Sequence, residues 1–108
     1  MPKSKILIER DLSSRLECNC HAAKRLEQIV ELAQKLYDAN EIDYTITLKQ
    51  SKKEPRSVNM IVQVPFFDIL VKTKKMFIEL IDMTDSFSIK NDDEREACDY
   101  IFKINNVL

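Results

Sequence analysis

The chain of 108 residues contains no glycine. An average chain of this length would carry about seven or eight. The Walker A loop, the GxGxxG dinucleotide turn, the GXXG clamp of KH domains and the GxSxG nucleophile elbow all need a residue without a Cβ at a fixed position. The sequence therefore excludes a large share of nucleotide-dependent and hydrolase chemistry.

Length and composition predict one globular domain over residues 1–108. Hydrophobic residues make up 44% of the chain and charged residues 32%, which is enough apolar material for a core without disulfides or metal. Seventeen basic and eighteen acidic side chains give a net charge of −1. The chain as a whole is not a polycationic nucleic-acid binder, so any binding of anions must be local.

The beginning of the chain and the cysteines bear on its location. Within "MPKSKILIERDL" only three apolar residues are consecutive, too few for the apolar region of a signal peptide or for a membrane span. Three cysteines is an odd number, and a reducing compartment would keep them as thiols. We expect a cytoplasmic protein without membrane contact.

The first half of the chain predicts a strand, a helix and a hairpin. Residues 5–9 favour a strand, and a helix begins either at Ser14, with Glu17 at capping-box spacing, or at Asn19. It continues to residue 37, and Asn40 is expected to stop it in a left-handed conformation. Its apolar stripe consists of Ala22, Ala23, Leu26, Ile29, Val30, Ala33, Leu36 and Tyr37. Alternating residues in 42–49 and 58–64 then predict two strands joined by a long loop.

The second half predicts a helix over 66–83 after Pro65, a strand at 86–90 and a closing helix within 91–104. The closing helix is inferred from an acidic start followed by Ala97, Ile101 and Ile104 at helical spacing.

The resulting order is β-α-β-β-α-β-α, an α+β fold. It matches the split βαβ topology of ferredoxin-like domains with an extra C-terminal helix, and that topology places the first and third strands in the centre of the sheet. A single helix from residue 14 would overshoot the sheet, so its opening turns either are not helical or project beyond it. The alternative is a three-stranded or smaller α+β domain with a helical N-terminal segment.

Cys18, Cys20 and His21 are the residues most suggestive of chemistry. On one continuous helix they diverge, so the three cannot hold one ion, and the spacing matches no C-x2-C pair. The simplest interpretation is a half-buried Cys18 beside an exposed Cys20 and His21. No base, oxyanion donor or carboxylate pair marks a reaction centre. We expect no metal, no cofactor and no enzymatic activity, although the sequence leaves open whether these three residues have a role.

The loop between the two central strands is locally basic, with four cationic side chains against Glu54. Such a loop suits a phosphate backbone or an acidic protein surface, and it is also typical of a solvated loop that prevents edge aggregation. Base stacking of the RNA-recognition type is disfavoured, because residues 6–8 and 58–64 contain no aromatic side chain.

Two further stretches offer surface for a second contact. The outward face of the hairpin, with Thr45, Thr47, Asn59, Ile61 and Gln63, is polar but nearly uncharged, and Phe67, Val71 and Ile78 fall on the far side of the helix over 66–83. Either the closing helix, a second copy of the chain or another protein would cover them.

The sequence therefore favours a small non-enzymatic protein that binds another protein as an inhibitor or adaptor, the kind often encoded by phages or mobile elements. A nucleic-acid-binding module using loop 49–56 is the alternative, and an enzyme or metal-binding accessory at Cys18, Cys20 and His21 is a third hypothesis. A homodimer is also open. The expected partner-binding residues are Lys49, Lys52, Lys53, Arg56, Ile61, Phe67, Val71 and Ile78.

Overall fold

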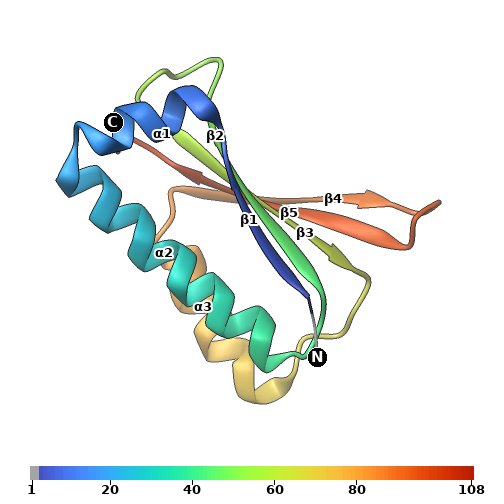
Figure 1. Cartoon of the computed structure of the whole chain (residues 1–108). Coiled ribbons are helices and arrows are strands. Elements are labelled where there is room, and N and C mark those ends of the chain that lie inside the picture. The colour runs from blue at the N-terminus through green and yellow to red at the C-terminus, as the bar shows by residue number, and fades with distance from the viewer. Residues whose placement is uncertain (1–2) are drawn as a thin grey trace.

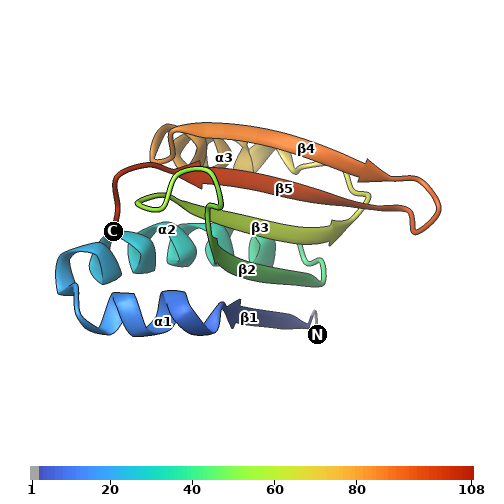
Figure 2. The same ribbon diagram turned by 90° about the horizontal axis from the view of Figure 1, so that it is seen from above.

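The computed structural model of residues 3–108 shows a mixed five-stranded sheet (Figures 1 and 2). Two helices, α2 (Cys20–Ala39) and α3 (Lys74–Asp82), cover one face of this sheet. The predicted α+β class is confirmed. In chain order the elements are β1 (Ser4–Ile8), α1 (Arg10–Glu17), α2 (Cys20–Ala39), β2 (Tyr44–Gln50), β3 (Val58–Pro65), the short 3-10 helix η1 (Val71–Thr73), α3 (Lys74–Asp82), β4 (Ser86–Asp92) and β5 (Ala97–Ile104). Figure 2 looks onto the other face of the sheet, with α2 and α3 behind the strands.

The order of the strands is β1-β2-β3-β5-β4, with β1 parallel to β2 and every other pair antiparallel. The ferredoxin-like arrangement is wrong, because β1 lies at an edge of the sheet and not in its centre. The helices α1 and α2 form the crossover that a parallel pair requires, and they return the chain directly beside β1. The free side of β3 is then taken by β5, a strand that the sequence analysis did not expect.

The first predicted helix is two helices. Ser14 lies inside α1, so its spacing to Glu17 marks no helix start, and the helical path breaks after Glu17. Asn19 is the true N-cap of α2, because its Oδ1 accepts a hydrogen bond from the backbone N–H of Ala22 at 3.1 Å. This break resolves the overshoot, since α1 continues beyond the end of β1 while α2 alone crosses the sheet (Figure 2).

The helix predicted over 66–83 begins later than expected. Residues 66–70 form no helix, and α3 starts only after η1. Asn40 provides a reason, because its Oδ1 accepts a hydrogen bond from the Leu70 N–H at 2.9 Å and its Nδ2 donates to Thr73 Oγ1 at 3.1 Å. Asn40 itself is not left-handed as predicted. The positive φ, 54°, belongs to Glu41.

The predicted closing helix is wrong, because residues 97–104 form β5 between β3 and β4. Ala97, Ile101 and Ile104 fit a helical period by coincidence, whereas Cys98, Tyr100, Phe102 and Ile104 alternate and face the core. The acidic residues before them form the turn of the β4–β5 hairpin, where Glu96 has a φ of 49°.

The core lies between α2 and the sheet. The predicted stripe of α2 is buried except for half-buried Ala23, and the inward residues of the two central strands are buried as predicted. These inward residues are Tyr44, Ile46, Leu48, Val58, Met60, Val62 and Val64.

An aromatic cluster joins this core to α3 and β4. Tyr100 contacts Tyr37, Phe67, Phe77 and Phe87 with ring centroids 5.8 to 6.2 Å apart. Phe77 of α3 also meets Phe87 of β4 at 5.5 Å. The cluster therefore holds α3 over the β4–β5 pair.

The hydroxyl of Tyr37 is buried and has no hydrogen-bond partner among residues 3–108. Burial also raises the pKa of Tyr37 well above its ordinary value. Since an unpaired buried hydroxyl is unfavourable, we expect Tyr37→Phe to leave the free energy of unfolding unchanged or to raise it by up to about 1 kcal/mol in urea denaturation.

Tyr44→Phe is the matched control, because the Tyr44 hydroxyl donates to Asp38 Oδ1 at 2.9 Å. Its loss should lower the free energy of unfolding by about 0.5–1.5 kcal/mol. A larger loss in Tyr37→Phe than in Tyr44→Phe would contradict the assignment of an unpaired hydroxyl.

Candidate protein-interaction surfaces

The sheet face opposite α2 and α3 has no covering element within residues 3–108 and carries an apolar row at its middle. Strand register places Leu7, Thr47, Ile61, Ile101 and Ser88 side by side across all five strands. Leu7 is 42% exposed, and Ile61 and Ile101 are half-buried. We call the outward side of the sheet the uncovered face.

Basic side chains surround this row. Of the strand residues that point outward, Lys5, Lys49, Lys90 and Lys103 are cationic and only Asp92 and Asp99 are anionic. The adjoining loop 51–57 adds three basic residues and one acidic residue. Seven basic against three acidic side chains give this part of the molecule +4, and since the whole chain carries −1, the remainder carries −5. The outward strand positions and loop 51–57 are therefore net basic, whereas the turn at the other end of the strands, residues 93–96, carries −2.

Loop 51–57 is braced by contacts that use some of its charges. Glu54 Oε1 forms an ion pair with Lys103 Nζ at 2.9 Å, and the Ser57 hydroxyl donates to Glu54 Oε2 at 3.1 Å. Arg56 Nε donates a hydrogen bond to the Leu108 carbonyl at 3.2 Å, so Arg56 holds Leu108 against the loop.

Lys49, Lys52 and Lys53 are exposed and form no ion pair with residues 3–108. The four predicted basic residues thus divide into three free lysines and one arginine engaged in the fold.

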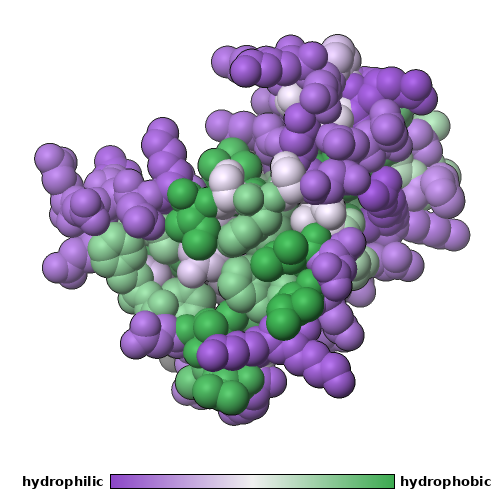
Figure 3. Space-filling model, turned by 180° about the vertical axis from the view of Figure 1, so that it is seen from behind, coloured by the Kyte–Doolittle hydropathy of each residue, from purple (hydrophilic) through white to green (hydrophobic). Residues whose placement is uncertain are grey.

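A second surface lies at the β4 edge of the sheet, on the side that the helices cover. It extends over η1, α3 and β4. Its exposed apolar members are Phe66, Leu70, Val71, Ile78 and Ile89, with exposed fractions of 46%, 41%, 80%, 59% and 51%. Figure 3 looks at this side and shows a central apolar area bordered by hydrophilic surface. We call these five residues the apolar edge surface.

The structure divides the predicted binding residues between these two surfaces. Val71 and Ile78 belong to the apolar edge surface, and Phe67 lies half-buried beside it in the aromatic cluster. Ile61 lies with the lysines on the uncovered face. Because the last element is β5 and not a helix, no closing helix covers Val71 and Ile78.

Phe66, Leu70 and Ile89 were missed by the sequence analysis. The apolar run at 66–71 was assigned to a helix that would bury part of it, and the strand containing Ile89 gave no sign of lying at an edge. Only the order of the strands shows that, among residues 3–108, β4 pairs with β5 alone.

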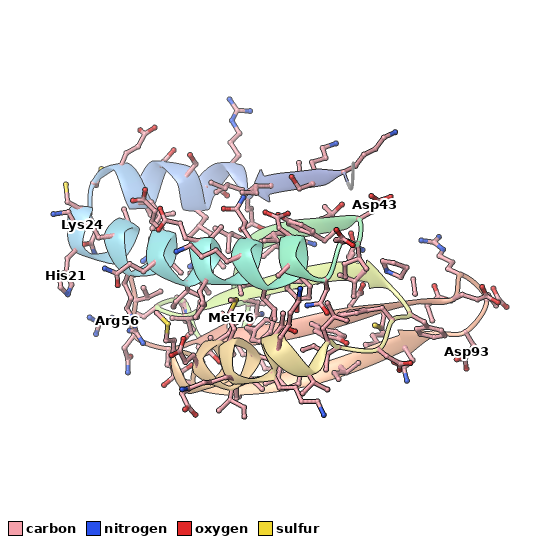
Figure 4. All side chains as sticks on the ribbon, turned by 90° about the horizontal axis from the view of Figure 1, so that it is seen from below. His21, Lys24, Asp43, Arg56, Met76 and Asp93 are labelled. Atoms are coloured by element: carbon pink, nitrogen blue, oxygen red, sulfur yellow. The ribbon has the colours of Figure 1, made fainter. Side chains whose placement is uncertain are left out.

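The Cys18, Cys20 and His21 side chains lie at the break between α1 and α2. All three are exposed, which corrects the expected half-burial of Cys18. Figure 4 shows His21 and Lys24 at the end of the molecule opposite Asp93. Between residues 3 and 108, His, Cys, Asp and Glu side chains form no group of three or more that could hold a metal ion. Burial raises the pKa of the Cys98 thiol, so this cysteine is a poor nucleophile.

In comparisons with known proteins, no family model matches the chain, and no curated protein or solved structure shows a significant similarity. Within residues 3–108, no helix is both long enough and apolar enough to span a membrane.

The brace of loop 51–57 should depend on pH. The hydrogen bond from Lys103, followed by that from Ser57, lowers the pKa of Glu54 below its ordinary value of 4.5. A carboxyl whose pKa is lowered by folding contributes stability above its unfolded pKa, and this contribution disappears as the pH falls through the lower folded value.

We expect Glu54→Gln to be less stable than the parent near neutral pH, with the two stabilities converging as the pH is lowered from about 7 to about 3. Because Glu54 is at the surface, the difference should be small and should shrink with added salt. A constant difference over the whole pH range, measured by urea denaturation, would argue against the ion pair.

Proposed function

We propose that the protein is a small non-enzymatic regulator, of the inhibitor or adaptor type that phages and mobile elements often encode, and that it binds an acidic protein on its uncovered face. The observation that carries this proposal is the net basic charge of this face and of loop 51–57. A face and loop of +4 on a chain of −1 favour a partner of opposite charge and speed the encounter with it.

The middle of the face supports a protein as the partner. The row through Leu7, Ile61 and Ile101 gives an apolar centre, and the lysines form a polar rim, which is the usual anatomy of a protein interface. Lys52 and Lys53 extend this rim on the loop, at one end of the strands (Figure 1).

A non-enzymatic role is supported by the residues whose pKa is raised, since Glu54, whose pKa is lowered, only braces the surface loop. Burial raises the pKa of Tyr100 to about 12, and it likewise raises the pKa of Tyr37, Tyr44 and Cys98. These groups line the core and would not ionise near neutral pH, so they favour packing over acid–base chemistry.

The second candidate is a nucleic-acid-binding module, and the three free lysines of residues 49–53 are the observation that favours it. The aromatic side chains of the strands point into the core, as Tyr100 and Phe102 do, and the outward residues of the strands are not aromatic. Phosphate contacts alone would then have to supply the affinity.

Charge reversal of the loop separates these candidates. The tagged full chain is used to isolate partners from extracts of its own host, and association of each purified partner is measured with the parent, Lys52→Glu/Lys53→Glu and Ile61→Asp. We expect the loop variant to slow association about tenfold at low salt, with the difference closing as salt is added, and Ile61→Asp to speed dissociation.

Lys24→Glu/Lys35→Glu is the matched control, because it makes the same change in net charge at exposed positions of α2. Binding that responds equally to the control and to the loop variant would reject the uncovered face as the site. Tight, salt-sensitive binding of labelled DNA or RNA that disappears in Lys52→Glu/Lys53→Glu would instead favour the nucleic-acid module.

A further inference from the structure

The apolar edge surface is separate from the uncovered face, so the proposed partner does not cover it. The distribution of charge along α3 indicates what does. Lys72 lies in η1 just before this helix and Lys74 and Lys75 lie at its beginning. Glu79 and Asp82 lie towards its end. All five are exposed, and none forms an ion pair with residues 3–108. The helix macrodipole is positive at the N-terminus and negative at the C-terminus, so this distribution is the reverse of the favourable one.

A second copy of α3 running antiparallel would make the same charges favourable. Lys74 precedes Ile78 by four residues and Asp82 follows it by four. These three positions share one face of the helix. A two-fold axis at Ile78 would therefore bring the two Ile78 side chains together and place each Lys74 beside the Asp82 of the other copy.

The neighbouring strand fits the same axis. β4 pairs only with β5, so its other edge is free within residues 3–108, and Ser86 through Ile89 carry no charge to keep a second strand away. Antiparallel pairing of two β4 strands about Ser88 would set Phe87 opposite Ile89 and Lys90 opposite Ser86, with no like charges facing each other.

The two contacts are compatible in space. Phe77 contacts Phe87 of β4 and Tyr100 of β5, so α3 lies over this pair of strands. Ile78 is next to Phe77 in the sequence and Ser88 is next to Phe87, so the two proposed axis positions lie at the same level along helix and strand. Strands in a sheet are about 4.8 Å apart. The two α3 axes would thus lie about 10 Å apart, which is the distance of packed helices.

The other edge of the sheet does not fit a second copy in this way. Beside β1 a groove is lined by apolar residues such as Ile6, Ile8 and Val30, but also by Glu27 and Glu31. Two copies meeting there would bring four carboxylates of the same sign together.

We propose that a second copy of this chain packs on the α3–β4 edge across a two-fold axis through Ile78 and Ser88, joining the two sheets into one. This dimer is independent of the proposed function, because it leaves the uncovered face free. The two uncovered faces would lie on the same side of the joined sheet, so that one dimer presents two partner sites.

The test measures the mass of the full chain by sedimentation over a range of concentrations. The parent should approach twice the chain mass of 12.7 kDa. Lys74→Glu and Asp82→Lys should each weaken association about tenfold, because the two-fold axis repeats every altered contact. The double variant Lys74→Glu/Asp82→Lys should restore association, since the pairs are rebuilt with their signs exchanged.

Ile78→Lys should abolish the dimer while keeping the circular dichroism of the folded chain, and Lys35→Glu on α2 should leave association unchanged. Association, and not thermal stability, is the measurement, because the exchanged charges also suit the helix dipole of a monomer. A parent that stays monomeric at high concentration, or a dimer that Ile78→Lys leaves intact, would overturn the proposal, as would failure of the double variant to recover.

Discussion

The aromatic contacts around Tyr100 are the interaction on which the second half of the fold depends. α2 packs on the central strands mainly with aliphatic side chains, whereas α3 adds Phe77 to its buried Leu80 and β4 contributes Phe87. Tyr100 contacts Tyr37 of α2, Phe77 of α3 and Phe87 of β4 at centroid distances of about 6 Å. Large rings can fill the space between two helices and a twisted sheet edge that shorter side chains would leave empty. They also fix which side of α3 faces outward, so that Ile78 is left exposed.

A chain without glycine must make its sharp turns with other residues, and the structure shows where it does so. Glu41, Glu96 and Asn106 adopt φ values of 54°, 49° and 51°. This region costs a residue with a Cβ about 1–2 kcal/mol, and asparagine tolerates it better than glutamate. The conformation at Glu41 follows Asn40, whose side chain bonds to both Leu70 and Thr73. These hydrogen bonds hold the C-terminal end of α2, where the turn into β2 begins, against the segment that leads into α3.

The two surfaces of the protein differ in the physics of the contacts that they favour. The uncovered face combines a narrow apolar row with basic charge, and long-range attraction favours rapid encounter with an acidic protein. The apolar edge surface combines exposed aliphatic and aromatic side chains with a free strand edge and a helix of reversed charge. A surface with these features is complementary to the same surface on a second copy of the chain, which is the property that a two-fold interface requires. Because the two surfaces are separate, the proposed dimer would leave the proposed partner site free.

The sequence by itself determined the α+β class, the stripe of α2, the central hairpin and β4, because each of these segments has a hydrophobic period that local geometry alone imposes. For β1 it only favoured a strand, because three consecutive apolar residues have no period that separates strand from helix. It also pointed to Val71 and Ile78, because they fall on the far side of the helix expected over 66–83, away from its main apolar arc. It could not determine the last element, because Ala97, Ile101 and Ile104 fit a helix as well as a strand until β3 and β4 are placed on either side. The edge position of β1 and β4, and the separation of Ile61 from Ile78, were decided only by the tertiary structure. Strand order depends on pairings between distant segments, and no local pattern records which edge remains free.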